Sequence, residues 1–344
     1  MSHARTKELL APWREALYNL EGDRPLAALE TVAPDARFRM CHPFGDFDQA
    51  GAFYRTVFVP LIQAWPDLER RDYILLAEKD EDGALWVGCA GFYTGTFLAP
   101  WLDIPPTGLQ SHLRFHEFYR IEGDRVVELQ AIWDIPEVML QANAWPLAPS
   151  LGREWHVPAP ATGDGLRISG SEEQAQATRR HVVEMLEHMK RHPDQGPEAM
   201  QMERFWHEKF SWYGPAGIGT GRGVAGFRHW HQIPFLRAMP DRGKHNQNTN
   251  QHFFTEGAYA AVTGWPNMAQ TLSGDGWLGI APTGKRVTLR SLDFWRLEKG
   301  RIRENWVLVD LLDLFQQIGV DVFARLREFN KRRSLNPIDL KKGY

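Results

Sequence analysis

Cysteine is almost absent from this chain of 344 residues, in which Cys41 and Cys89 are the only two. Two cysteines cannot build the disulfide framework of a small secreted domain, and their scarcity is typical of a reducing compartment. Long hydrophobic runs are missing as well, since no stretch approaches the roughly 18 apolar residues that a membrane-spanning helix needs. The segment Met1–Leu20 also lacks the apolar core of a signal peptide. We therefore expect a soluble cytoplasmic protein.

A surplus of charge of either sign is also lacking. The chain has 40 Lys and Arg against 43 Asp and Glu, which gives a formal net charge of −3. This balance provides no electrostatic attraction toward nucleic acid or a membrane surface, so neither is expected as a partner. Aromatic residues are plentiful, with 14 Trp and 19 Phe, and they are sufficient to line large cores or apolar cavities.

Signatures of metal and phosphate sites are missing too. His188 and His192 are four residues apart in a predicted helix, but Pro193 follows at once and no third ligand is evident. The glycine-dense segment 217–226 lacks the Lys-Ser/Thr ending and the strand-to-helix setting of a phosphate-binding loop. We predict neither a metal nor another cofactor.

The sequence contains the same series of motifs twice. FYRTVFVPLIQAWPD begins at Phe53, and FRHWHQIPFLRAMPD begins at Phe227. Farther on, WLDIPPTG begins at Trp101 and WLGIAPTG at Trp277, and the segments 113–134 and 289–310 then align without a gap. Because the blocks keep their order and spacing, we infer an internal duplication.

The two copies define the domain organisation. We predict a first domain at residues 1–150, a linker at 151–169 and a second domain at 170–344. The predicted linker lies within a stretch rich in Pro and Gly, and Ser171 follows it as a candidate N-cap of the next helix.

Each copy begins with helical periodicity and continues with strand-like runs. In the first copy, hairpin strands flank the turn at Glu122–Asp124, and in the second they flank Lys299-Gly300. Helices followed by a curved antiparallel sheet predict an α+β fold, with a small-molecule pocket between the leading helices and the concave face of the sheet.

The order of motifs resembles the SnoaL-like polyketide cyclase family. It comprises a Pro-Asp turn, Thr94-Gly95-Thr96, Pro-Thr-Gly at Thr283-Gly284, an acid three residues before Arg296, and the strand Gly300–Asp310. This family belongs to the nuclear-transport-factor-2-like superfamily, so the resemblance implies two tandem cone-shaped domains, each a curved antiparallel sheet wrapped around N-terminal helices. It also implies cofactor-independent acid/base chemistry in an apolar pocket. The fold itself hosts many unrelated activities.

The sequence departs from the family pattern at one functional position. Many cyclases of this family carry their principal catalytic acid directly after the Trp of the Glu-x-Trp strand. This chain has Val307 there in the second copy and Ala131 in the first. The departure counts against the standard cyclase mechanism in either copy.

Glu117 and Asp293 are the first catalytic candidates. Alternation along a strand places each of them on the more apolar face of its predicted strand, in both copies. A carboxyl group among aromatic side chains has a raised pKa, which suits proton transfer near neutral pH. The competing explanation is a buried acid paired with a nearby arginine.

Two further catalytic candidates come from the second copy. Asp310 follows the last predicted strand, but Asp313 stands three residues later, so an N-cap role competes with catalysis. His252 ends the segment HNQNTNQH, in which Asn248, Asn250 and His252 would share one face of a strand. We expect the two amides to bind polar groups of a substrate, while a solvent-facing edge or a dimer surface is the alternative.

Aromatic side chains complete the expected pocket. We predict substrate contacts from Trp212, Tyr213 and Trp306 in the second copy and from Tyr93 in the first. Aromatic residues in such positions also serve as ordinary core, which is the competing explanation.

We therefore predict a cofactor-independent cyclase, isomerase or hydrolase of the SnoaL-like type that acts on a small apolar carbonyl compound. The alternative is a non-catalytic small-molecule-binding or scaffold protein with the same fold. The first copy lacks the row of amides and is expected to be the degenerate one. Pairing through the outer faces of the sheets is expected, either as an internal pseudo-dimer or across a homodimer.

Overall fold

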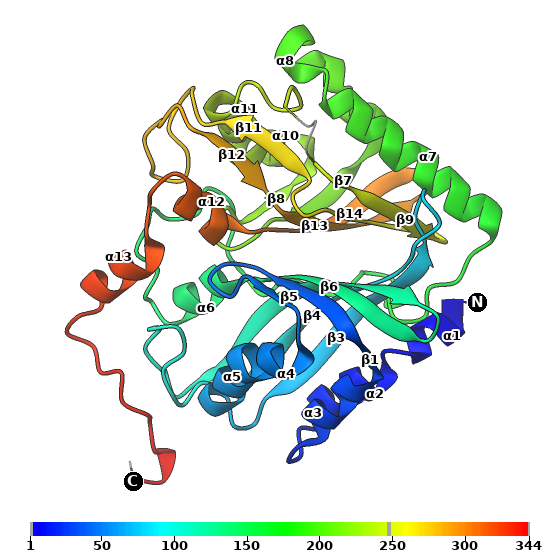
Figure 1. Ribbon diagram of the computed structural model, residues 1–344. Helices are drawn as coiled ribbons and strands as arrows, with labels where there is room; N and C mark the ends of the chain where they lie inside the picture. The colour runs from blue at the N-terminus through cyan, green and yellow to red at the C-terminus, as the bar shows by residue number, and fades with distance from the viewer. Residues whose placement is uncertain (1–2, 246–248, 343–344) are drawn as a thin grey trace.

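The structure is a computed structural model that describes residues 3–245 and 249–342. It contains two α+β units, each with a six-stranded sheet and helices on one side of it (Figure 1). None of the helices within the described ranges is long and apolar enough to cross a membrane.

The first unit comprises residues 3–141. Its elements are α1 (His3–Glu8), α2 (Ala11–Tyr18), α3 (Arg24–Ala28), the 3-10 turn η1 (Leu29–Thr31), β1 (Val32–Met40), β2 (Asp46–Phe47), α4 (Ala50–Phe53), the π-helical turn η2 (Tyr54–Phe58), α5 (Val59–Ala64), β3 (Glu69–Lys79), β4 (Leu85–Thr96), β5 (Gln110–Glu122), β6 (Arg125–Trp133) and α6 (Ile135–Gln141).

The second unit begins at residue 172 and repeats this order. Its elements are α7 (Glu172–Met189), α8 (His192–Gln195), η3 (Pro197–Met200), α9 (Met202–Phe205), β7 (Trp206–Tyr213), β8 (Thr220–Arg222), α10 (Gly223–Phe227), the π-helical turn η4 (Arg228–Gln232), α11 (Ile233–Ala238), β9 (His252–Glu256), β10 (Tyr259–Thr263), β11 (Met268–Thr271), β12 (Arg286–Leu289), β13 (Ser291–Glu298), β14 (Arg301–Val309) and α12 (Leu311–Gln317). Helix α13 (Val322–Phe329) and the short turn η6 (Leu340–Lys342) follow.

The two sheets have the same topology. Their strand orders are β2-β1-β6-β5-β4-β3 and β8-β7-β14-β13-β10-β9. Most neighbouring strands are antiparallel, but β1–β6 and β7–β14 are parallel pairs, so the expected antiparallel sheet contains one parallel pair in each unit. The predicted hairpin turns are confirmed, because β5 ends at Glu122 and β13 ends at Glu298.

A proline accounts for a break in the second sheet. Strand β4 runs without interruption, whereas its counterpart is divided into β10 and β11 around the cis peptide bond Trp265–Pro266. Proline has no N–H to donate to a strand ladder. Strands β11 and β12 instead form a separate two-stranded sheet at the end of the second unit.

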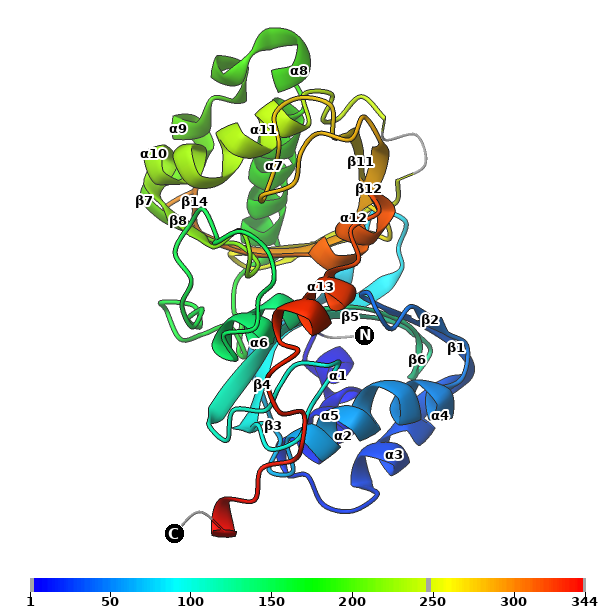
Figure 2. The same ribbon diagram turned by 90° about the vertical axis from the view of Figure 1, so that its left-hand side faces the viewer.

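The two units pack with the outer faces of their sheets against each other (Figures 1 and 2). Helices α2 to α5 of the first unit and α8 to α11 of the second lie on the far sides, whereas α6, α12 and α13 lie near the seam. The Phe118 and Phe294 rings meet at a centroid distance of 5.0 Å. His116 Nδ1 lies 2.6 Å from the Leu292 carbonyl oxygen, and Thr263 Oγ1 donates to Gln130 Oε1 at 2.6 Å. The chain is therefore an internal pseudo-dimer, one of the two expected arrangements.

Segments outside the sheets also cross between the units. Lys7 of α1 forms a 2.7 Å ion pair with Glu256 of the second unit. The segment after α13 returns to the first unit, where the Ile338 N–H donates to the Leu98 carbonyl oxygen at 2.7 Å. The stretch between the units is also packed, since the Pro158 carbonyl oxygen accepts from Trp306 Nε1. At its end, Ser171 caps α7 as expected, accepting from the Gln174 N–H.

Substituting Gly88 with valine tests the packing between the units. A Cβ atom at Gly88 of β4 would lie 3.0 Å from the Phe294 ring and 3.2 Å from the Phe118 ring. We expect Gly88→Val to lower the free energy of unfolding by about 1–3 kcal/mol, as overpacking does in close-packed cores. Urea unfolding followed by tryptophan fluorescence measures this loss.

Gly226→Val serves as the control, because a Cβ atom at this helical glycine meets no atom within 4 Å. Its unfolding free energy should change by less than about 0.5 kcal/mol. Equal effects of the two substitutions would contradict close packing between the sheets.

Candidate functional site

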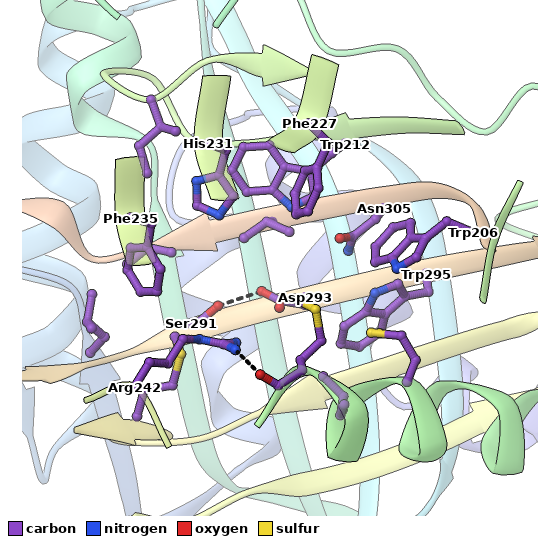
Figure 3. Close-up of a pocket in the computed structure, with 18 of the residues that line it drawn as sticks. Trp206, Trp212, Phe227, His231, Phe235, Arg242, Ser291, Asp293, Trp295 and Asn305 are labelled. Carbon is purple, nitrogen blue, oxygen red and sulfur yellow. Dashed lines mark hydrogen bonds between the residues drawn. The ribbon is translucent and has the colours of Figure 1, made fainter. Parts of the chain in front are cut away.

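A cavity of about 100 Å³ lies in the second unit between the concave face of the sheet and the helices that cover it (Figure 3). An adjoining cavity of about 70 Å³ shares part of its wall. Most of the lining is apolar and aromatic. The side chains that Figure 3 labels around the cavity are Trp206, Trp212, Phe227, His231, Phe235, Arg242, Ser291, Asp293, Trp295 and Asn305.

Asp293 is the acidic residue in this wall. It lies on β13 directly opposite Val307 of β14, and both side chains face the cavity. Ser291, two residues earlier on the same face, donates its hydroxyl to Asp293 Oδ1 at 2.5 Å. Burial disfavours the charged form and raises the pKa of Asp293 to about 7, although the Ser291 hydrogen bond and the Arg242 charge act in the opposite direction. The carboxyl group can therefore exist in either protonation state near neutral pH.

His231 faces the same cavity from the opposite wall (Figure 3). It belongs to the π-helical turn η4, which lies just before Pro234 at the start of α11. A proline cannot donate to the preceding turn, and a widened turn accommodates this loss. The imidazole stacks on Trp212 with ring centroids 3.9 Å apart.

His231 is neutral at physiological pH. Burial first, and then the charge of Arg242, lowers its pKa to about 3. Within the described part of the chain, His231 Nδ1 has no hydrogen-bond partner. A neutral imidazole with a free ring nitrogen can donate or accept one hydrogen bond from a bound molecule, depending on its tautomer.

The equivalent carboxyl group of the first unit has a different environment. Glu117 is 2% exposed, and its Oε2 accepts from the Arg70 guanidinium at 2.7 Å and from the Tyr119 hydroxyl at 2.5 Å. Its Oε1 accepts from Tyr93 at 2.9 Å and from Trp133 Nε1 at 3.0 Å. Glu117 thus forms a buried ion pair with an arginine, which was the alternative to a catalytic role. Tyr93 is one of the hydrogen-bond donors to its carboxylate.

Larger side chains fill the interior of the first unit. Phe115 occupies the position of Ser291, and Trp133 occupies the position of Val309, which lines the second-unit cavity. An apolar cavity of about 20 Å³ remains elsewhere in the first unit, and Glu117 is not part of its lining. The space around the carboxyl group thus exists in the second copy and is occupied in the first.

The structure corrects the expected role of His252. Strand β9 begins at this residue, and Phe253 is the residue that pairs with the inward-facing Val262. Alternation therefore turns His252 toward the first unit, where its Nδ1 lies 2.7 Å from Asp80 Oδ2 and its ring packs on Trp86. His252 connects the two units and does not line either second-unit cavity.

The expected row of amides is also corrected. Asn250 lies before β9, is exposed, and its side-chain nitrogen lies 3.1 Å from His252 Nε2. Asn248 lies outside the described residues. Gln251, between Asn250 and His252, is the amide that lines the smaller cavity.

Among the remaining candidates only Trp212 lines the larger cavity. Tyr213 and Trp306 are neighbours in register on β7 and β14 and lie on the opposite face of the sheet, where their rings are 5.4 Å apart. Asp310 caps α12 by accepting from the Asp313 N–H, and its other oxygen accepts from the His42 N–H of the first unit. It connects the units and is absent from the lining of both second-unit cavities.

Sequence reasoning missed His231, Arg242 and Asn305. His231 belongs to no recognisable motif, although alignment of the two copies gives it the position of Val57, an apolar residue. Arg242 follows the shared Pro-Asp turn, where the first copy has Leu68. A polar residue in one copy at an apolar position of the other is the signal that would have found both. Across the described ranges, no group of three or more His, Cys, Asp or Glu residues is arranged to hold a metal ion.

Comparison with known proteins places both units in one family. The family model of the SnoaL-like polyketide cyclases matches residues 13–142 and 197–318. A search of curated proteins finds no significant match.

Several solved structures resemble single units of the chain. AclR from Streptomyces galilaeus, provisionally described as a hydroxylase, is 18% identical, and the alignment covers 41% of this chain and 98% of AclR with a TM-score of 0.35. A provisionally described SnoaL-like polyketide cyclase from Jannaschia sp. CCS1 is 15% identical over 44% of this chain and 96% of its own, with a TM-score of 0.36. IdmH from Streptomyces antibioticus, provisionally described as a polyketide cyclase, is 20% identical over 40% and 98%, with a TM-score of 0.32.

The environment of Asp293 predicts a pH-dependent stability. A carboxyl group whose pKa is higher in the folded chain, here about 7, than in the unfolded chain, about 3.9, stabilises the fold fully only below its unfolded pKa. This stabilisation is lost as the pH rises to the folded pKa. Asp293→Asn removes the titration, so the variant should melt about 5 °C above the parent at pH 8.5.

Thermal unfolding followed by circular dichroism between pH 4 and 8.5 measures this difference. It should widen up to about pH 7 and then stay constant. Asp275→Asn, at an exposed loop position of the same unit, is the control and should follow the parent at every pH. A constant offset of Asp293→Asn from the parent would contradict a raised pKa.

Proposed function

Because the chain belongs to the SnoaL-like polyketide cyclase family, we propose that its second unit is a cofactor-independent acid/base enzyme for a small apolar carbonyl compound. The observation that carries this proposal is Asp293, a carboxyl group in an apolar cavity with a pKa raised to about 7. The pKa of an efficient general base lies near the operating pH, and burial is a usual way to raise that of a carboxyl group.

The proposed reaction begins with proton abstraction next to a carbonyl group. The ionised Asp293 takes a proton from the carbon beside the carbonyl, and the C–H electron pair moves to form an enolate. His231, on the opposite wall, supplies a hydrogen-bond donor for the enolate oxygen when the proton is on its cavity-facing nitrogen. Asn305, on the neighbouring strand, already donates one amide N–H to the Phe294 carbonyl oxygen at 2.9 Å and has its second N–H left for the enolate. In a cyclisation the enolate carbon then attacks a second carbonyl carbon of the same molecule, the C=O π electron pair moves to its oxygen, and this oxygen takes the proton from Asp293. In an isomerisation Asp293 returns the proton to another carbon of the enolate system.

The position of the base separates this proposal from the standard mechanism that the family resemblance implies. Val307 stands where many cyclases carry their acid, and it lies directly opposite Asp293 in the strand register. In this chain the carboxyl group that faces the cavity lies on the neighbouring strand. The Glu117 side chain, with its oxygens occupied by four donors, has a structural role in the first unit.

A non-catalytic binding protein is the second candidate function. The observation in its favour is again Val307, an apolar side chain at the family's acid position. In that case the cavity would hold a small molecule without transferring a proton. The two candidates differ in whether Asp293 affects the chemistry of a bound carbonyl compound or only its affinity.

Hydrogen–deuterium exchange tests the role of Asp293 without knowledge of the natural substrate. The protein is incubated in D2O with 2-tetralone, an apolar ketone with acidic C–H groups, and loss of the C–H signal is followed by proton NMR. We expect exchange above the buffer rate, and Asp293→Asn should lower the enzymatic rate by about 10²- to 10⁴-fold, the usual contribution of a general base. Asp275→Asn is the matched control on an exposed loop and should keep the parental rate.

Binding of 2-tetralone without exchange above the buffer rate would favour the non-catalytic candidate. Exchange that Asp293→Asn leaves unchanged would reject Asp293 as the base. Thermal unfolding of each variant shows whether a lost rate reflects loss of folded protein.

The pH dependence of the exchange rate gives a separate prediction. Only the ionised carboxylate accepts a proton, so the enzymatic rate should rise about tenfold per pH unit below the pKa of Asp293, about 7. Above this value the rate should level off, once exchange caused by hydroxide in buffer alone is subtracted. A profile that is already level at pH 5 would contradict a base with a raised pKa.

A further inference from the structure

The cavity contains a cation that no acidic side chain neutralises by direct contact. Arg242 lines both the larger and the smaller cavity, and Figure 3 shows its side chain beneath Asp293 and Ser291. Within the described ranges, no carboxylate forms an ion pair with Arg242 at 4.0 Å or less, and its one side-chain hydrogen bond goes to the Met189 carbonyl oxygen at 3.5 Å. This leaves most of the five N–H donors of the guanidinium available.

The first unit shows what a neutralised arginine looks like in this fold. Arg70 is fully buried and contacts Glu117 at 2.7 Å and Asp72 at 2.8 Å, so its charge is balanced by the protein itself. In the second unit the acid and the arginine face the same space without contact. Arg242 is half-buried, and a charge that is largely removed from water without a counter-charge is costly, so such charges are normally paired or bound to a ligand.

The neighbouring acid of the same chain, Asp241, is directed away from Arg242. Its Oδ1 accepts from the Thr271 N–H at 2.8 Å, and its Oδ2 lies 3.0 Å from His245 Nε2. Lys190, which lines the smaller cavity, is itself paired with Glu187 at 2.6 Å. The unbalanced positive charge of this wall therefore belongs to Arg242.

We infer that Arg242 is a subsite for a carboxylate group, so that the second-unit cavity takes a small hydrophobic carboxylic acid. This inference deepens the proposed function and rests on it for the reaction, since the same molecule would carry the carbonyl group on which Asp293 acts. Guanidinium groups bind carboxylates with two parallel N–H···O bonds. These charge-assisted hydrogen bonds are stronger than those that a guanidinium forms with a neutral oxygen.

The surroundings favour a monoanion over a phosphate. Arg242 is the one cavity-lining cation without a carboxylate partner among the described residues, and Asp293 beside it carries a negative charge when ionised. A dianion would be repelled by that charge and would need further donors. The rest of the wall is aromatic, with Trp206, Trp277 and Trp295 among its members, and fits a ring or a branched hydrocarbon body.

Binding of 2-naphthoate and 2-naphthamide, measured by isothermal titration calorimetry, tests the subsite. The two probes have the same ring and nearly the same shape and differ in charge. The parent protein should bind 2-naphthoate at least tenfold more tightly. Arg242→Gln should bring the two affinities within about twofold of each other, chiefly by weakening that for 2-naphthoate, and Arg242→Lys should keep part of the preference as a single point charge.

Arg237→Gln is the matched control, because Arg237 is an exposed arginine on the neighbouring helix α11. It should retain the full preference for 2-naphthoate. Equal binding of the two probes by the parent, or a preference that survives in Arg242→Gln, would overturn the inference. Thermal unfolding confirms that each variant is folded.

The outcome separates this inference from the proposed function. Selective binding of 2-naphthoate together with failure of 2-tetralone exchange would sustain the carboxylate subsite and reject the acid/base enzyme. Exchange that depends on Asp293, together with equal binding of the two naphthyl probes, would support the acid/base enzyme and reject the carboxylate subsite.

Discussion

The packing of the two sheets against each other determines which side chains can form a site. Because the outer faces are covered, residues such as Phe118 and Phe294 become an interface core, and the alternate residues of the same strands point to the concave sides. Strand alternation then directs Asp293 and Glu117 toward the concave sides of their sheets. The interface also explains why polar residues at sheet edges and strand ends, among them His252 and Asp310, connect the units and do not line the second-unit cavities.

The two inward carboxyl groups show how strongly surroundings decide the chemistry of one position. Glu117 has an arginine in contact and three further hydrogen-bond donors, so its charge is fully satisfied by the protein. Asp293 has one hydroxyl donor and a cavity, and its pKa rises accordingly. A difference between the copies such as Ser291 at the position of Phe115 accompanies the change from a structural ion pair to a candidate base.

More of the fold than of the candidate site could be predicted from the sequence. Duplication, hairpin turns and the inward direction of Asp293 follow from periodicity and repeat comparison, which are local properties of the chain. His252 and Asn250 were placed incorrectly because the start of β9 fixes the alternation, and no pattern in HNQNTNQH marks that start. The position of His231 depends on a π-helical turn and on the Trp212 ring of β7 that stacks on it. The importance of Arg242 depends on its lack of an acidic partner, and a sequence does not display such a lack.

Joining both units in one polypeptide changes what mutation can do to them. In an assembly of two identical chains, every substitution changes both cavities at once, so one cavity cannot be lost while the other is kept. Here the two copies are encoded separately, and Phe115 and Trp133 close one hollow while Ser291 and Val309 keep the other open. The filled unit still provides the surface against which the sheet of the open unit packs, so the copies share one interface while only the second keeps space beside its inward carboxyl group.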